Sequence, residues 1–257
     1  MKKIILFLCF FITNVFVFTQ SFTREDLLLA INSISKEIAL EPKNPTKYSM
    51  RAEFYYQLGE YQASLEDYNK SISFGLKTFD IYNSRAIVKL ALGDTNGAET
   101  DLLHVIMLNK EFDEAYYNLG FIYTNTDLEK AIFYFTECIK YNRNNIDALN
   151  ARGYCYRKLS KYDLAISDFT LAIKRSKVQR PNLFYNRAKC YIEINEFKSA
   201  YNDVCYALKL NSDNKYAKEI LGYYYFKIGD VANSCKVWSE VRYLSQEYSE
   251  IYVSECR

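Results

Sequence analysis

The sequence contains few of the residues that catalytic sites usually need and few that break helices. Histidine occurs once, at His104, and the 257 residues include only three prolines and eight glycines. A single histidine excludes a multi-histidine zinc site and leaves no redundancy for a Ser/His or Cys/His nucleophile pair. Few prolines and glycines are typical of long helices joined by short turns. The sequence therefore favours a helical protein without a catalytic centre.

Motifs for nucleotide, redox and metal chemistry are also absent from the sequence. The chain has no C-x-x-C, no G-x-G-x-x-G and no G-x-x-x-x-G-K-[ST] sequence. The segment 75–78 resembles a phosphate loop only superficially, because it falls in a turn between two expected helix pairs. We therefore expect no enzyme activity, no small-molecule substrate, no cofactor and no metal. An accessory enzyme module is the least favoured alternative.

Charge of either sign is not in excess. Lysine and arginine total 33 against 31 aspartates and glutamates. A protein that binds nucleic acid by neutralising phosphates needs a positive excess, so we expect no nucleic-acid partner. Aromatic residues are abundant instead, with 25 tyrosines and 17 phenylalanines that must be packed in a core or used for binding.

Residues 1–20 differ in kind from the rest of the chain. A pair of lysines precedes the apolar run Ile4–Phe18, and small polar residues follow it. The run is shorter than the roughly 20 residues of a membrane span and fits a secretory signal peptide. We expect cleavage near Thr19 or Gln20 and export to the periplasm or the extracellular space. In the alternative, the segment stays uncleaved and anchors the protein to a membrane.

Residues 21–44 are expected to form one helix without a hairpin partner. Thr23 is a candidate N-cap, and the apolar positions from Leu27 to Ile38 recur at helical spacing. Pro42 and Pro45 end the helix. The segment is equivalent to the second half of a hairpin and predicts an N-terminal capping helix.

A helix–turn–helix pattern then repeats along residues 45–244. In its clearest copy, Gly153 and Tyr156 lie on one stripe of a first helix, and Ala165 and Phe169 lie on one stripe of a second. Small residues at the crossing and large ones beside it are what two antiparallel helices need. The first stripe position recurs every 33 to 35 residues, at Tyr48, Tyr82, Tyr116, Leu149, Phe184 and Lys218. This spacing matches the helix-hairpin period of about 34 residues.

These copies resemble tetratricopeptide repeats, which carry an aromatic, Leu, Gly and Tyr in the first helix and Ala, Phe and Ala in the second. The third copy matches at Tyr116, Leu119, Gly120, Tyr123, Ala131 and Phe135. The usual closing proline is replaced by Lys110, Arg143 and Ser212. The resemblance implies an all-α, right-handed superhelical solenoid of six hairpins, with residues 245–257 as a C-terminal capping helix. The hairpins would span residues 45–78, 79–112, 113–145, 146–180, 181–214 and 215–244.

Arginine and aspartate occur together within the repeats at a fixed offset of sixteen residues. Copies with leucine at the arginine position, Leu119 and Leu221, have Tyr134 and Val237 in place of the acid. The offset places both residues on facing helices, which favours structural bidentate ion pairs over arginines that bind an external anion. The four predicted pairs are Arg51 with Asp67, Arg85 with Asp101, Arg152 with Asp168, and Arg187 with Asp203.

Six cysteines follow the N-terminal segment, and an even number in an exported chain permits disulfides. Cys138, Cys155 and Cys190 occupy positions where the family places small apolar residues, so we expect mostly free, buried thiols. Cys235 with Cys256 is the first candidate for a bridge, because it would hold the terminal helix in place.

In such a superhelix the first helix of each hairpin lines a concave groove, as the resemblance implies. Asparagine can donate to and accept from a peptide backbone, and tyrosine adds rigid contact area. These residues suit an extended peptide or a partner helix, whereas the alternative is a solvated face. The residues assigned to the groove are Asn83, Ile87, Tyr117, Asn118, Phe121, Asn150, Tyr154, Tyr185, Asn186 and Lys189.

The groove differs from that of the family's chaperone-binding members, which clamp a carboxylate with lysines, an arginine and asparagines. The corresponding positions here are Ser49, Glu53, Ser84, Glu114 and Asn118, so we expect no acidic chaperone tail as partner. Arg157 and Lys158 make the middle of the groove locally basic, although Asp147 opposes them. The sequence thus predicts a non-catalytic scaffold that binds protein partners in the cell envelope. The alternative is a structural, self-associating envelope subunit with an empty groove.

Overall fold

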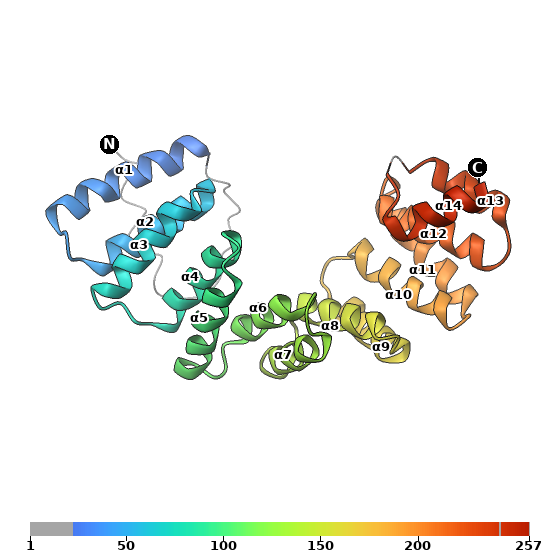
Figure 1. The fold of residues 1–257 in the computed structure, drawn as a ribbon, viewed down its shortest axis with the longest axis horizontal. Coiled ribbons are helices and arrows are strands. Elements are labelled where there is room, and N and C mark those ends of the chain that lie inside the picture. Colours follow the sequence, from blue (N-terminus) through green and yellow to red (C-terminus); the bar gives the residue numbers. More distant parts are fainter. Residues whose placement is uncertain (1–22, 242, 257) are drawn as a thin grey trace. The chain divides into compact units, whose positions relative to one another are not determined.

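The computed structural model describes residues 23–241 and 243–256. The predicted signal peptide, residues 1–20, lies outside the described residues. Within the described part the chain forms fourteen helices, α1 to α14, and no strand (Figure 1). The chain is divided into two compact units, of which the first ends at Leu76 and the second begins at Lys77. The all-α array of helix hairpins expected from the sequence is confirmed.

The first unit contains α1 (Arg24–Leu40), α2 (Pro45–Leu58) and α3 (Tyr61–Ser73). Thr23 caps α1, since its hydroxyl accepts from the Asp26 amide while the Asp26 carboxylate accepts from the Thr23 amide. The apolar stripe of α1 packs on α2, and Ile34, Ile38 and Tyr48 form a shared core. The helix therefore covers one side of the first hairpin.

The second unit begins with three hairpins: α4 (Phe79–Ala91) with α5 (Thr95–Leu108), α6 (Asp113–Tyr123) with α7 (Leu128–Tyr141), and α8 (Ile146–Lys158) with α9 (Tyr162–Arg175). It continues with α10 (Pro181–Glu193) and α11 (Phe197–Leu210), then α12 (Lys215–Lys227) and α13 (Val231–Ser239), and ends with α14 (Gln246–Cys256). Within this unit each second helix packs on its own first helix and on the first helix of the next hairpin. This arrangement lets every hairpin bury the apolar side of its neighbour.

Small residues allow the two helices of several hairpins to approach closely. A Cβ at Gly120 would lie 2.6 Å from the Phe135 ring, and one at Gly153 would lie 2.9 Å from the Phe169 ring. Both phenylalanines are fully buried. At these two crossings, the absence of a side chain on the glycine leaves the space that the aromatic ring of the second helix fills.

Five of the six turns inside the hairpins contain one residue in the left-handed region of backbone space, whereas the turn between α6 and α7 contains none. Gly93 and Gly229 take this conformation with φ of 82° and 83°, whereas Ser160 and Asn195 do so with φ of 56° and 62°. Glycine adopts such angles without steric cost, and asparagine tolerates them.

Among the described helices, none is both long and apolar enough to cross a bilayer.

Candidate functional site

The predicted groove residues lie on α4, α6, α8 and α10, which are the first helices of four successive hairpins of the second unit. Helix α10 packs against both α8 and α12, and Asn118 of α6 is hydrogen-bonded to Asn83 of α4. Their shared face carries a row of amides and aromatic rings. This face is the candidate functional site.

The asparagines of the face are linked in pairs between neighbouring hairpins. Asn118 donates from Nδ2 to Asn83 Oδ1 at 3.4 Å, and Asn186 donates to Asn150 Oδ1 at 3.2 Å. Asn83 is only 6% exposed, which corrects its assignment as a contact residue. It orients the half-buried Asn118 from behind, because a buried amide must find a partner.

The aromatic residues of the face differ in how much surface they offer. Phe121 is 62% exposed, whereas Tyr117 packs on the Phe135 ring and Tyr185 on the Tyr216 ring. Ile87 and Tyr154 are half-buried. Burial raises the pKa of both Tyr117 and Tyr185, so their hydroxyls stay protonated and can donate hydrogen bonds at neutral pH.

Positive charge gathers toward the C-terminal part of the face. The Arg157 guanidinium lies 5.1 Å from the centre of the Tyr154 ring, and Lys158 Nζ lies 5.8 Å from it. Lys189 is predominantly buried, and burial lowers its pKa while its hydrogen bond to Glu247 opposes that effect. The charge of Lys189 is thus already paired with a carboxylate of the same chain.

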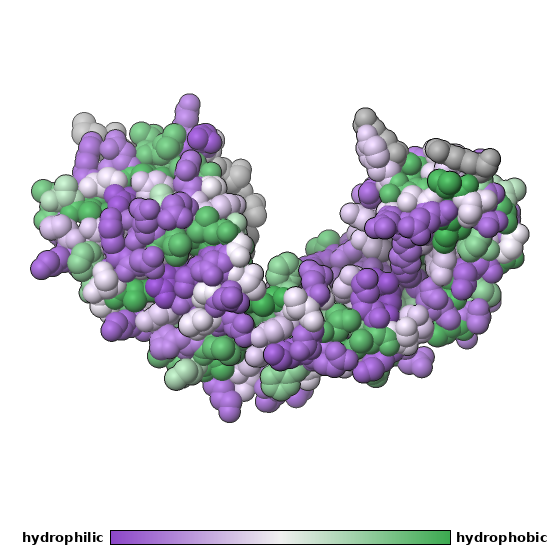
Figure 2. Space-filling model, in the orientation of Figure 1, coloured by the Kyte–Doolittle hydropathy of each residue, from purple (hydrophilic) through white to green (hydrophobic). Residues whose placement is uncertain are grey.

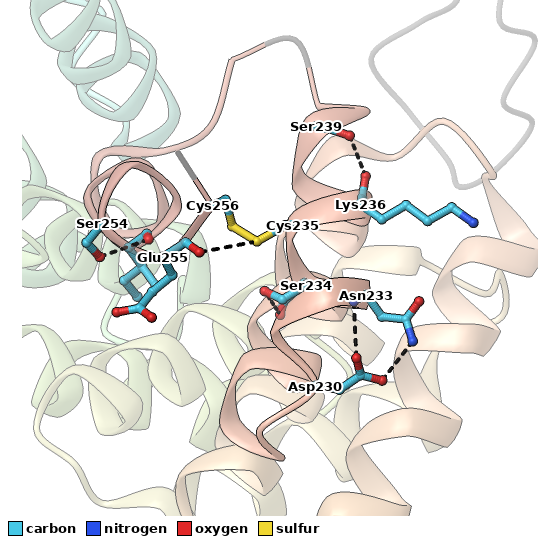
Figure 3. The surroundings of a disulfide bond; sticks show 11 residues. Asp230, Asn233, Ser234, Cys235, Lys236, Ser239, Ser254, Glu255 and Cys256 are labelled. Carbon is cyan, nitrogen blue, oxygen red and sulfur yellow. Dashed lines mark hydrogen bonds between the residues drawn. A yellow bond between two sulfur atoms is a disulfide. The ribbon is translucent and has the colours of Figure 1, made fainter.

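Helix α14 provides that partner and is the C-terminal capping helix predicted from the sequence. In the structure, α14 packs on α13 and also reaches α12 and α10. Its N-terminal end is fixed where the Ser245 amide donates to Glu219 Oε1 at 2.7 Å, and its C-terminal end where Cys256 is bonded to Cys235 (Figure 3).

The four predicted ion pairs form with one geometry. In each pair the arginine Nε and Nη2 donate to the two carboxylate oxygens of its aspartate at 2.6–2.8 Å. All four aspartates are buried. The hydrogen bond to Asp67 is the main cause of the raised pKa of Arg51. These arginines are therefore held by the hairpins themselves.

Sequence reasoning missed a third contact of these arginines. Nη1 donates to a hydroxyl on the preceding helix, from Arg51 to Ser35, from Arg152 to Thr136 and from Arg187 to Thr170. Each arginine thereby joins two successive hairpins, or α1 and the first hairpin. The signal was present in the sequence, since the hydroxyl precedes the arginine by 16 or 17 residues.

The remaining cysteines and the histidine have structural positions. Cys138, Cys155 and Cys190 are buried free thiols, and Cys205 is a half-buried free thiol. His104 is half-buried, with its ring 4.3 Å from that of Tyr82. The Cys138 thiol lies 3.9 Å from Asp113 Oδ2, and burial raises its pKa to about 12, so it stays protonated at neutral pH. In Figure 2, hydrophilic and hydrophobic residues are interspersed on the visible face of each unit.

The fold and the row of amides define a helix-hairpin repeat protein. Family models described as tetratricopeptide repeat match residues 48–74, 113–145 and 134–167. These stretches of the chain therefore match tetratricopeptide repeats. Proteins built from them generally mediate protein–protein interactions and are typically non-catalytic scaffolds.

Comparison with known proteins agrees with this fold. A tetratricopeptide repeat protein from Parabacteroides merdae superposes with a TM-score of 0.65, over 91% of this chain and 93% of that chain, at 20% identity. YrrB, described as a TPR protein with an unusual peptide-binding site, gives a TM-score of 0.60 over 73% of this chain and 96% of that chain, at 18% identity.

A curated relative is the BBSome complex member BBS4 homolog of Drosophila melanogaster. It is 22% identical over 189 residues, which cover 73% of this chain but only 39% of the fly protein. The chain therefore spans well under half of the relative it matches.

Proposed function

We propose that this protein is a non-catalytic scaffold that binds an extended peptide or a partner helix along α4, α6, α8 and α10. The paired asparagines carry the proposal. Asn118 and Asn186 are each oriented by a neighbouring asparagine and each remains half-buried, so each keeps hydrogen-bonding capacity for a backbone. The exposed Phe121 ring adds apolar contact area beside them.

The names of similar proteins support this reading. YrrB is described with a peptide-binding site, and the fly relative is named as a member of a complex. The N-terminal segment supports export, because its charged start and short apolar run fit a secretory signal. On this proposal the scaffold works in the periplasm or outside the cell, or at a membrane surface if the segment is retained.

A crosslinking and capture experiment tests the site. The double variant Asn118→Ala/Tyr154→Ala should lose the partners that the wild-type chain recovers from its native host. The matched control is Tyr201→Ala/Asn202→Ala, which removes an exposed tyrosine and asparagine from the second helix α11. Unchanged partner recovery in the groove variant would refute the site.

The second candidate is a self-associating structural subunit. Exposed apolar side chains on second helices favour it, namely Met107 on α5 and Phe133 on α7. Light scattering during size exclusion separates the two functions. A strict monomer that keeps its partners supports the scaffold, whereas a defined oligomer that is lost in Met107→Ser/Phe133→Ser supports self-association.

A further inference from the structure

Helix α14 covers the C-terminal end of the candidate surface through an ion pair with unequal burial. Lys189 Nζ donates to the two carboxylate oxygens of Glu247 at 2.6 and 2.8 Å. The lysine side chain is 11% exposed and the glutamate side chain 56% exposed. The lysine is thus built into the array, and the glutamate approaches it from outside in the way a ligand would.

The next residue of α14 fills an aromatic site. Tyr248 is 2% exposed, with its ring 5.4 Å from the Tyr223 ring and 5.9 Å from the Trp238 ring. Lys189 Nζ also lies 5.0 Å from the centre of the Tyr248 ring. One lysine therefore contacts both members of the Glu247–Tyr248 pair, by charge and by a cation–π contact.

The fit of α14 is incomplete. The Tyr248 hydroxyl and the Arg157 Nε are both buried and find no hydrogen-bond partner among residues 23–241 and 243–256. Arg157 lies near enough to Tyr248 to oppose the rise in tyrosine pKa that burial causes. Buried polar groups without partners are costly, so an occupant that satisfies them would bind better than α14.

Helix α14 is retained by its connections as well as by its fit. The disulfide between Cys235 and Cys256 closes a 21-residue separation in sequence. In Figure 3 this bond joins the end of α14 to the middle of α13. A tethered segment has a high effective concentration at its site, so an imperfect occupant can still exclude a free partner.

We propose that α14 is a built-in occupant of a docking surface formed by Arg157, Lys189 and Tyr223. Once α14 is released, this surface accepts an acidic helix of a partner protein in which a glutamate is followed directly by a tyrosine. The proposal rests on the proposed function and names the chemistry of the partner at one end of the groove. Opening the Cys235–Cys256 bond is the step that frees α14. An external dithiol opens the bond in two exchange steps: its first thiolate attacks the bridge, forming a mixed disulfide and releasing one cysteine, and its second thiolate attacks the mixed disulfide and releases the other. The dithiol is left oxidised as its own disulfide, and both cysteines are reduced.

A labelled peptide with the sequence of residues 244–255 is the probe, measured by fluorescence anisotropy against the full chain. In the closed wild-type protein the peptide competes with tethered α14. The variant Cys256→Ser/Glu247→Lys lacks the bridge and repels its own α14 from Lys189. This opened variant should bind the peptide at least tenfold more tightly than the oxidised wild type.

Two further substitutions locate the binding. Adding Lys189→Met to the opened variant should abolish the gain, whereas Lys209→Met, an exposed lysine on α11, should leave it unchanged. A peptide carrying Lys at the Glu247 position should bind more weakly than the native sequence. Equal affinity of the closed and opened proteins, or binding indifferent to Lys189→Met, overturns the proposal.

Hydrogen exchange on the wild-type chain gives a readout that needs no variant. Reduction should speed amide exchange in residues 246–256 while the amides of α8 keep their protection. Unchanged exchange in α14 after reduction would show that the bridge does not retain it. Because the probe is the chain's own segment, its failure leaves the Asn118 and Tyr154 site untouched, and a failure of partner capture leaves the peptide result standing.

Discussion

Arg152 and Asp168 face each other across the hairpin of α8 and α9, with the arginine Nε and Nη2 donating to the two carboxylate oxygens at 2.8 and 2.7 Å. The aspartate is 5% exposed. A bidentate pair in this position satisfies two buried groups at once. Its removal has a larger effect than its net contribution, because the remaining charge keeps its burial and loses its partner.

The variant Asp168→Ala should therefore be clearly less stable than the wild type, by about 3–5 kcal/mol. Asp163→Ala is the control, since Asp163 is an exposed residue in the first turn of the same helix. Thermal unfolding followed by circular dichroism measures both. Equal losses in melting temperature would contradict a structural role for the pair.

The contact of Gly120 with Phe135 predicts a coupling between the two residues. Gly120→Ala places a methyl group where the ring lies, and overpacking of this kind costs about 1–3 kcal/mol. Alanine's better helix propensity offsets only part of that cost. Phe135→Leu should leave more room at the crossing, so the double variant should be more stable than the sum of the single losses indicates. Additive losses in urea unfolding would show that the two side chains do not compete for space.

The buried thiols should react slowly in the native protein. Burial raises the pKa of Cys138 and of Cys190 to about 12 and that of Cys155 to about 11. Because the thiolate is the reactive form, alkylation of these three at pH 8 should be at least about a hundredfold slower than in denaturant. Peptide mapping should find the half-buried Cys205 labelled first. Fast labelling of Cys190 in the folded protein would contradict its burial.

The raised pKa values of these thiols also set a direction for alkaline stability. A folded pKa above the unfolded one contributes stability that is complete below about pH 9 and is lost as pH rises through the folded value near 12. Cys138→Ala should therefore flatten the fall in unfolding free energy between pH 9 and 11. Cys205→Ala serves as the comparison, and an equally steep fall in Cys138→Ala would argue against this thiol as a source.

Reduction of the Cys235–Cys256 bond should destabilise the C-terminal part of the second unit. Closing a loop of this size restricts the unfolded chain and is worth about 3 kcal/mol. Cys256→Ser without reductant should reproduce the lowered melting temperature, whereas Cys205→Ser should not. Alkylation of Cys235 in unreduced, denatured protein would show instead that the bridge is not formed.

Much of the architecture was predictable because it depends on local patterns. The period of the stripe positions, the small residue opposite each aromatic and the Thr23 cap are each encoded within about 34 residues. The Arg–Asp pairs were equally readable, since their sixteen-residue offset follows from hairpin geometry. Asn83 was assigned wrongly to the groove surface. Its burial depends on contacts with the next hairpin, where Asn118 is hydrogen-bonded to it.

By itself, the sequence determined that the chain forms stacked helix hairpins, since each hairpin has an apolar face that only a neighbour of the same kind can bury. Only the tertiary structure decided that Glu247 and Tyr248 meet Lys189, 58 residues away for the glutamate. No period relates these positions, because the final helix departs from the repeat and its place is fixed by long-range packing and by the bond between Cys235 and Cys256.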